Sequence, residues 1–276
     1  METIQEKIMK RRLYTTSTNY TLNAFAPQAE EKAKTNNAIQ TILSIAKVMP
    51  GNVPSTCPKC DGSGYIKTYE NGIGRLETCP ICAERKAHEA RLANSGISKE
   101  DYEAYTLDTF KRDTECAAAM GEVADRFINT RKPYQGCGFF GKPGTGKTHI
   151  CIAICQALKL PHYYWQYRAE IQRIKNSAYK NSQVYDELIV KPSKASLLFI
   201  DDLFKGAIIN GGLAPQDQQI MFDIINRRYM NRLPTIFSSE YSLDKITSFD
   251  EAIGSRIAEM CRPFICKCQG QNRRLS

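Results

Sequence analysis

The chain has 276 residues and a formal net charge of +9, so it is long enough for two domains and its charge favours a polyanionic partner such as nucleic acid. A solvated basic face would explain the same charge. The first twenty residues are polar and no apolar run reaches eighteen residues, so neither a secretory signal nor a membrane span is visible and we expect a cytoplasmic protein. The eleven cysteines favour reduced thiols and a metal site over a disulfide framework.

The first 49 residues begin with a basic stretch and continue into a helical pattern over residues 27–48, with Ile39, Ile42, Leu43 and Ile45 near its end. A segment of this size forms little core by itself. Its apolar face therefore needs either the next domain or another protein, and the sequence leaves both open. A Pro/Gly-rich linker follows at residues 49–55.

Two cysteine pairs, Cys57/Cys60 and Cys79/Cys82, enclose eighteen residues. This spacing is typical of a four-thiolate zinc site, and with all four positions filled the zinc would be structural. Glycines and aromatic residues between the pairs predict a small hairpin ribbon. Four reduced cysteines in ordinary turns are the alternative. A charged helix is expected over residues 83–94.

The most specific motif of the chain fits the phosphate-binding pattern G-x-x-x-x-G-K-[ST]. It reads Gly141, Lys142, Pro143, Gly144, Thr145, Gly146, Lys147, Thr148. A short apolar strand precedes it and a helical pattern follows over residues 149–158, which is the setting that such a loop requires. We expect its backbone N–H groups and Lys147 to bind a polyphosphate, and the Thr148 hydroxyl to ligate Mg²⁺.

An apolar strand over residues 197–200 ends in Asp201 and Asp202, 54 and 55 positions after Lys147. This is typical of a buried parallel strand whose carboxyl end opens on a ligand crevice. Asp201 would hold Mg²⁺ through water, and Asp202 would orient or deprotonate the attacking water.

The remaining patterns predict an α/β fold with five strands between helices. Further strands are expected at residues 163–167, 234–239 and 262–268, and helices at 114–129, 217–232 and 243–260. We interpret Trp165 as core, and Cys266 and Cys268 as packing residues on one strand face.

Two segments that contain aromatic residues each have a structural and a functional interpretation. Tyr102, Tyr105, Leu107 and Phe110 precede the first strand of the sheet, where an adenine contact is one use and core packing the more common one. Basic residues alternate with Tyr179 and Tyr185 over residues 168–194, which suits either a grip on single-stranded nucleic acid or a solvated helix face.

Together these motifs resemble the DnaC/DnaI-type replicative helicase loaders, in the form found in phages and prophages of low-GC Gram-positive bacteria. The resemblance rests on the two cysteine pairs, residues 144–149 (Gly144 to His149), 199–203, 224–229, 234–240 and 254–257. It extends from Cys57 to the C-terminus and does not cover residues 1–49.

The resemblance implies an AAA+ P-loop ATPase core with a five-stranded parallel sheet between helices. It also implies that the protein uses ATP and Mg²⁺, assembles with itself, and places the replicative hexameric DNA helicase on single-stranded DNA. It assigns Lys147, Thr148 and His149 to the nucleotide loop, Asp201 to the magnesium site and Asp202 to catalysis. Arg256 matches the arginine that reaches a neighbouring subunit's nucleotide, which would stabilise charge on the γ-phosphate. An ordinary salt bridge is the alternative for Arg256.

The chain departs from the family pattern after the fourth strand, where Glu240 stands in place of an asparagine that senses the γ-phosphate. A carboxylate near phosphates is repelled unless magnesium, Arg256 or a lysine compensates, so Ser238 or Ser239 is expected to supply the polar contact. No lid domain with a second sensor arginine is evident, although Arg273 or Arg274 could approach the site.

We therefore predict an N-terminal helical segment at 1–49, a ribbon and helix at 50–96 that bind structural Zn²⁺, and an AAA+ domain at 97–276. The predicted function is an ATP-dependent helicase loader. An IstB-like transposition ATPase and a nucleotide-switched adaptor with little turnover remain alternatives.

Overall fold

The computed structural model describes residues 57–70, 72–178 and 182–275. The chain divides into two compact units, Met1–Cys82 and Ala83–Ser276. The helix predicted over residues 27–48 lies outside the described residues.

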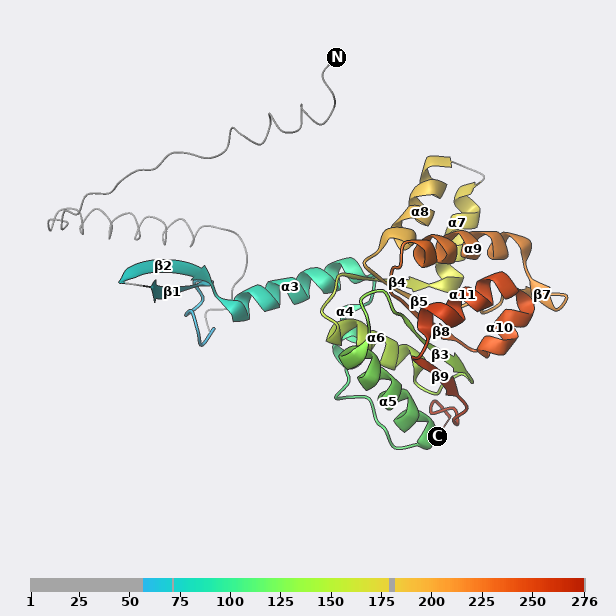
Figure 1. Ribbon diagram of the computed structural model, residues 1–276, viewed down its shortest axis with the longest axis horizontal. Coiled ribbons are helices and arrows are strands. Elements are labelled where there is room, and N and C mark those ends of the chain that lie inside the picture. Colours follow the sequence, from blue (N-terminus) through green and yellow to red (C-terminus); the bar gives the residue numbers. More distant parts are fainter. Residues whose placement is uncertain (1–56, 71, 179–181, 276) are drawn as a thin grey trace, which may run out of the picture. The chain divides into compact units, whose positions relative to one another are not determined.

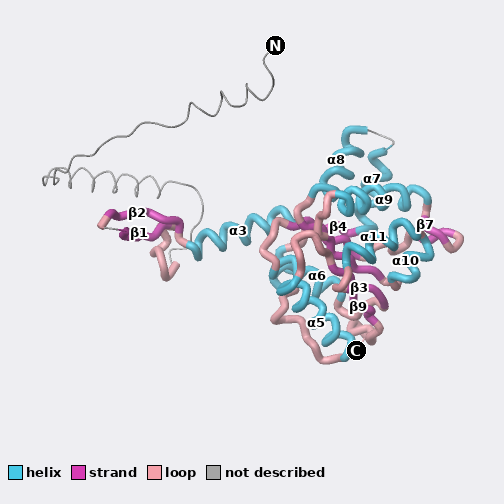
Figure 2. The backbone as a smooth tube through the Cα atoms, in the orientation of Figure 1, coloured by secondary structure: helices cyan, strands magenta, loops and turns pink. Residues whose placement is uncertain are grey.

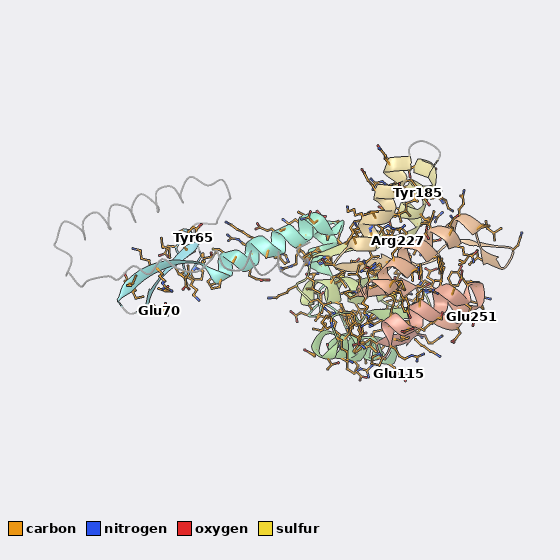
Figure 3. The ribbon with its side chains drawn as sticks, turned by 45° about the horizontal axis from the view of Figure 1, so that its top comes forward. Tyr65, Glu70, Glu115, Tyr185, Arg227 and Glu251 are labelled. Carbon is orange, nitrogen blue, oxygen red and sulfur yellow. The ribbon has the colours of Figure 1, made fainter. Side chains whose placement is uncertain are left out.

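The described part of the first unit is a two-stranded antiparallel hairpin (Figure 1). Strand β1 (Tyr65–Glu70) pairs with β2 (Ile73–Thr78), and Tyr65 and Glu70 mark the two ends of β1 in Figure 3. The predicted ribbon is thus confirmed. The hydrophobic cluster beside this hairpin consists of the four buried cysteines, with the partly buried Ile66 packed against them, so the apolar core is very small.

Helix α3 (Pro80–Ser95) begins three residues before the predicted start. Proline suits the first turn of a helix because its fixed φ is already helical and its missing N–H has no partner to lose there. The second cysteine pair therefore ends inside the first helical turn, and Cys82 projects from that turn.

The second unit is built on a five-stranded parallel sheet, which confirms the predicted α/β class. Its strands, in spatial order, are β4 (His162–Gln166), β5 (Leu197–Asp201), β8 (Thr235–Ser239), β3 (Cys137–Gly141) and β9 (Ile265–Cys268). Figure 2 shows these strands enclosed by helices. In chain order the first strand of this sheet is β3, which lies between β8 and β9. The strand order therefore reverses beside β3. Ligand crevices form at such switch points, at the carboxyl ends of the strands.

Alternate residues of each strand supply two separate cores because successive side chains point to opposite faces. Phe139 and Phe199 pack on one face, and Phe140 and Ile200 on the other. The first face is covered by α5 (Glu115–Thr130) and α6 (Lys147–Ala157), together with α4 (Lys99–Ala104). The second is covered by α7 (Tyr167–Ala178), α8 (Ser182–Lys194), α9 (Pro215–Met230), α10 (Leu243–Phe249) and α11 (Glu251–Cys261).

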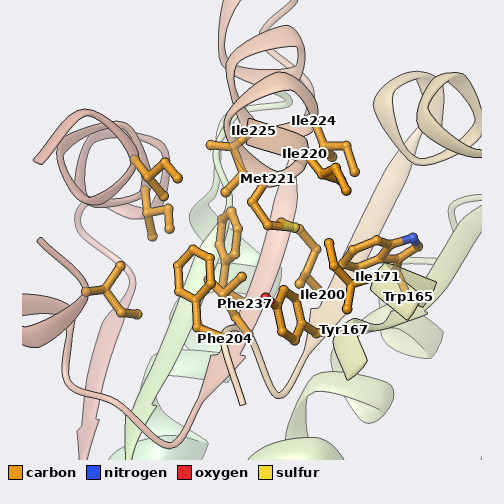
Figure 4. Packing of buried hydrophobic residues seen from close by; sticks show 14 of the residues in the cluster. Trp165, Tyr167, Ile171, Ile200, Phe204, Ile220, Met221, Ile224, Ile225 and Phe237 are labelled. Atoms are coloured by element: carbon orange, nitrogen blue, oxygen red, sulfur yellow. The ribbon is translucent and has the colours of Figure 1, made fainter. Parts of the chain in front are cut away.

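Helix α9 shows how the second core is packed. Figure 4 shows its apolar side chains directed at Ile200 and Phe237 of the sheet. Burial of each large apolar side chain contributes about 1.5–3 kcal/mol of transfer free energy. Trp165 is fully buried in the same cluster, as predicted.

A divided helix and an added hairpin are two of the differences between the structure and the predicted elements. The single helix expected over residues 243–260 is two helices, because the Asp250 backbone is extended and its carboxylate accepts a hydrogen bond from the N–H of Ile253, which caps a new helix. A two-residue hairpin, β6 (Ile208–Ile209) with β7 (Gly212–Leu213), was not predicted. Cys266 and Cys268 are buried on one face of β9, which confirms that they are packing residues.

Candidate functional site

A cavity of about 430 Å³ lies at the carboxyl ends of β3, β4, β5 and β8. Its wall is formed by the phosphate loop, the acidic end of β5, the segment before β3 and the C-terminal segment. The charged side chains that line it are Asp101, Lys147, Asp201, Asp202, Lys205, Glu240, Arg273 and Arg274. The predicted loop and the predicted acidic pair therefore meet in one place.

The phosphate loop runs from the end of β3 into α6, and its glycines are required by its shape. Gly144 has a φ of +72°, and a Cβ there would lie 1.8 Å from Asn272 Oδ1. Gly146 caps α6 with a φ of +99°. Such positive φ values leave backbone N–H groups free to turn toward an anion at a helix N-terminus, so the loop fits a polyphosphate.

Lys147 is almost fully buried and is tethered to the loop that precedes it. Its Nζ donates hydrogen bonds to the carbonyl oxygens of Gly141 (2.8 Å) and Lys142 (2.7 Å). Burial lowers the pKa of the Lys147 ammonium. This position holds the cation directly beneath the loop, where the phosphates of a nucleotide would lie.

Asp201 is surrounded by hydroxyl groups. Thr148 Oγ1 donates at 3.1 Å and 3.2 Å to its two carboxylate oxygens, Tyr164 Oη donates at 3.0 Å to Oδ2, and Ser238 Oγ donates to Oδ1. Burial nevertheless raises the pKa of Asp201. A carboxylate beside a threonine hydroxyl is an oxygen donor set that suits Mg²⁺, so the residues present fit this ion.

Asp202 lies on the turn that follows β5. Its backbone has a φ of +54°, and its N–H donates to Ser238 Oγ at 3.0 Å. The side chain accepts a hydrogen bond from Lys205 Nζ at 3.0 Å, and the same ammonium donates to Glu240 Oε1 at 2.7 Å. The compensating lysine that the position of Glu240 requires is therefore Lys205.

The two serines that end β8 have different roles. Ser238 bridges the acidic pair, because its hydroxyl donates to Asp201 and accepts from the N–H of Asp202. Ser239 Oγ donates instead to the carbonyl oxygen of Leu203 at 2.7 Å. Glu240 borders the cavity and Ser239 does not.

The aromatic segment before β3 is divided between core and cavity. Tyr102 is fully buried and stacks on His162. Tyr105 and Phe110 line the cavity, where their ring centroids lie 4.8 Å and 5.2 Å from that of His149. This aromatic wall beside the phosphate loop suits a planar base.

The C-terminal segment packs on the phosphate loop. The N–H of Arg273 donates to the carbonyl oxygen of Gly144 at 3.0 Å, and the N–H of Lys142 donates to that of Cys268 at 2.8 Å. The Arg273 guanidinium forms an ion pair with Asp113 and donates to the carbonyl oxygen of Lys111. Both Arg273 and Arg274 line the cavity.

Arg256 is not part of the cavity wall in its own chain. Its guanidinium lies against the rings of Phe222 (5.1 Å) and Tyr229 (5.6 Å) and donates to Asn226 Oδ1 at 3.0 Å. A role in a neighbouring subunit's site stays a prediction.

The four cysteines of the first unit have the geometry of a zinc site. Their Sγ atoms all lie within 4.8 Å of one another, and all four residues are buried. The Cys57–Cys79 and Cys60–Cys82 sulfur separations are 3.8 Å and 3.5 Å. Zinc–sulfur bonds of about 2.3 Å in a tetrahedron place the sulfurs roughly 3.8 Å apart, so the residues fit Zn²⁺.

The basic residues over 168–194 are partly engaged within the chain. Lys175 forms an ion pair with the buried Asp217, and Lys191 Nζ lies 4.2 Å from the centroid of the Tyr163 ring. Tyr179 and Lys180 lie outside the described residues. The pattern is therefore less available to nucleic acid than its sequence suggests.

A second cavity, of about 530 Å³, lies beside the end of α9. Arg228 is fully buried at its wall and donates to Thr235 Oγ1 and to three backbone carbonyl oxygens. These hydrogen bonds engage all three nitrogens of the guanidinium and hold the turn between α9 and β8 in place. The wall of this second cavity has neither a phosphate loop nor a carboxylate pair. The cavity beside the phosphate loop is therefore the better candidate for the functional site.

Tyr164 and Lys205 are among the residues of the cavity beside the phosphate loop that were not predicted. Tyr164 and its partner Asp201 are 37 positions apart in the chain, so no local spacing identifies Tyr164. Lys205 follows Asp202 by three positions, but its second partner, Glu240, lies 35 positions away. Within the described residues, no helix is long and apolar enough to cross a membrane.

Comparison with known proteins agrees with this geometry. The family model described as ATPase family associated with various cellular activities (AAA) matches residues 137–238. Phage-like element PBSX protein XkdC of Bacillus subtilis strain 168 is 27% identical over 227 residues, covering 78% of this chain and 82% of XkdC. Replicative helicase loader DnaC of Escherichia coli K12 is 27% identical over 130 residues, covering 45% of this chain and 49% of DnaC, so this chain spans about half of that relative.

A crystal structure of the DnaC helicase loader has the same fold. It superposes with a TM-score of 0.53 at 22% identity, covering 62% of this chain and 100% of that chain. Residues 137–238 therefore form an AAA ATPase domain, and the chain is similar to the DnaC/DnaI-type helicase loaders, in the form carried by a phage-like element.

Proposed function

We propose that this protein is a magnesium-dependent ATPase that delivers the replicative DNA helicase onto single-stranded DNA. The observation that carries the proposal is the meeting of Lys147, Thr148, Asp201 and Asp202 in one cavity of a chain similar to a named helicase loader. The net charge of +9 favours DNA as the second partner.

In this proposal each cavity residue has a separate task. The loop N–H groups and Lys147 bind the phosphates, while Thr148 and Asp201 hold Mg²⁺, which would neutralise phosphate charge when bound. Asp202 orients the attacking water and accepts its proton. Tyr105 and Phe110 pack against the base.

We further propose that the ATPase works as an assembly of several copies. Arg256 is separate from its own cavity, so it would act on the nucleotide of a neighbouring copy. An arginine that stabilises charge at the γ-phosphate couples hydrolysis to assembly.

The decisive experiment compares wild type with Asp202→Asn in ATP hydrolysis, helicase capture and helicase transfer to single-stranded DNA. Asparagine keeps the shape of the side chain but accepts no proton, so we expect ATP binding and helicase capture to persist, turnover to fall about a hundredfold or more, and helicase release to stop. Asp244→Asn, an exposed carboxylate on α10, is the matched control and should behave as wild type.

Two outcomes would contradict the proposal. Wild-type protein that neither binds the helicase nor changes its ATPase rate with DNA is not a loader. Asp202→Asn protein that still transfers the helicase without hydrolysis is a nucleotide-switched adaptor.

A further inference from the structure

We propose that Lys205 is a ligand of the nucleotide's terminal phosphate, held in readiness between Asp202 and Glu240, and that it makes the site selective for triphosphates. This inference rests on the proposed ATPase function and assigns a role to a residue that no motif of the chain identifies.

The three side chains form a compact triad at the cavity wall. Lys205 Nζ lies 3.0 Å from Asp202 Oδ2 and 2.7 Å from Glu240 Oε1. The lysine side chain is 38% exposed and each carboxylate side chain is 29% exposed, so solvent and ligand reach all three. All three line the cavity that Lys147 and Thr148 also line.

The backbone under this triad is fixed. The N–H of Leu203 donates to the carbonyl oxygen of Ser238 at 2.9 Å, and the N–H of Lys205 donates to that of Asp202 at 3.0 Å. The side chains of Leu203 and Phe204 are fully buried in the second core. Because these contacts hold the backbone, the Lys205 ammonium can exchange partners through changes in its side-chain torsions alone.

The charges of the triad explain why a lysine is needed here. Asp202 and Glu240 would place two negative charges beside a polyphosphate, and one ammonium reduces the triad to a single negative charge. An ammonium group has three donors, of which two are engaged, so one remains for a phosphate oxygen. The hydrogen bond to Glu240 raises the pKa of Lys205, so the group is positively charged at neutral pH.

Lys205 differs from Lys147 in what holds it. Lys147 is bound to backbone carbonyl oxygens of its own loop, whereas Lys205 is bound to two carboxylates that a phosphate can replace as acceptors. A terminal phosphate would draw the ammonium toward itself and release Asp202 from its ion pair. The same movement would leave the Asp202 carboxylate available to a water molecule only when a triphosphate is present.

The test is equilibrium binding of a non-hydrolysable ATP analogue and of ADP to the full chain in the presence of Mg²⁺. Replacing the ammonium removes a charge-assisted hydrogen bond that only the terminal phosphate receives, so Lys205→Met should weaken binding of the analogue at least about tenfold and binding of ADP less than about twofold. Lys205→Arg keeps the charge and should bind the analogue more tightly than Lys205→Met. Lys245→Met on α10, away from the cavity, should bind both nucleotides as wild type does.

A second pair of variants keeps the proposal falsifiable if Lys205→Met destabilises the fold. In a Glu240→Gln background one carboxylate is already neutral, and adding Lys205→Met should again weaken the analogue selectively relative to Glu240→Gln alone. Equal weakening of the analogue and ADP, or no weakening of either, would overturn the role of Lys205. Failure of the wild-type protein to bind either nucleotide would overturn the ATPase proposal as well.

Discussion

Tyr164 illustrates how single residues complete the candidate magnesium site. Its hydroxyl donates to Asp201 Oδ2, and burial together with the nearby Asp201 charge raises the pKa of Tyr164, so the hydroxyl keeps its proton and remains a donor. A donor of this kind favours the ionised carboxylate, which burial alone disfavours. In the proposed ATPase, Tyr164 would therefore act on Mg²⁺ through Asp201.

Tyr164→Phe should raise the Mg²⁺ concentration needed for half-maximal ATPase activity by about tenfold or more, because the Asp201 carboxylate loses one hydrogen bond, and hydrogen bonds to charged groups are worth about 1.5–3 kcal/mol. ATPase titrations with Mg²⁺ measure this shift. Tyr163→Phe is the matched control, because the Tyr163 ring lies against Lys191 instead. An unchanged titration curve for Tyr164→Phe would show that Asp201 does not depend on this contact.

Site residues that belong to a motif with fixed spacing could be predicted from the sequence. The loop from Gly141 to Thr148 was found because its chemistry requires close spacing in one turn. The cysteine pairs were found for the same reason. Tyr164 could not be found, since it meets Asp201 only after β4 and β5 pair side by side. Lys205 is close to Asp202 in the sequence, but it belongs to no motif, and its contact with Glu240 requires β5 and β8 to pair.

At the scale of the element, Asp250 decides where one helix ends and the next begins. Its carboxylate accepts a hydrogen bond from the Ile253 N–H at 2.9 Å and another from Gln218 at 2.7 Å. The apolar pattern over residues 243–260 continues through this position, which is why periodicity alone predicted one helix. At this position the capping carboxylate, and not the periodicity of apolar residues, decides where the helix ends.

Asp250→Ala should lower the free energy of unfolding by about 1 kcal/mol, within a range of about 0.5–2 kcal/mol for lost N-caps. Chemical denaturation of the nucleotide-free protein measures this loss. Asp244→Ala, in the first turn of α10 and largely exposed, should change stability by less than about 0.5 kcal/mol. An Asp250→Ala protein as stable as wild type would show that α11 does not need this cap.

Most strands were predicted within one to three residues, because buried parallel strands are short apolar runs. The expected strand at 163–167 is β4, shifted by one residue because Tyr167 already begins α7. The strand expected at 262–268 starts only at Ile265. The β6–β7 hairpin has two residues per strand, which is too short to give an alternating pattern.

At the scale of the whole molecule, the two compact units have very different cores. The ATPase unit has two extensive apolar clusters, whereas the described part of the ribbon unit has four cysteines and Ile66. Without a metal, the burial of so few apolar groups does not offset the conformational entropy that the ribbon loses when it folds. The ribbon should therefore depend on zinc while the ATPase unit does not.

Replacing Cys57 and Cys79 with serine should abolish zinc binding and hydrogen-exchange protection in β1 and β2. The thermal transition and nucleotide binding of the ATPase unit should be retained. Metal analysis and hydrogen exchange followed by mass spectrometry measure both effects. Cys116→Ser, a half-buried cysteine on α5, is the control and should keep its zinc. A zinc-free protein whose hairpin stays protected would contradict the assignment.

The class of the fold and its five strands could be predicted because each βα unit carries its own pattern. The spatial order of the strands could not, since it is decided by which apolar faces pack together. The separation of the cores by alternate residues, such as Phe139 and Phe140, likewise appears only once the helices are in place.

The hydrogen bond from the Arg273 amide to the Gly144 carbonyl gives the molecule a built-in spectroscopic reporter. The chemical shift of an amide proton follows the geometry of its acceptor, and Gly144 lies in the middle of the phosphate loop. A single labelled amide near the end of the chain would therefore register occupancy of the loop in solution, without any dye or modification placed in the cavity.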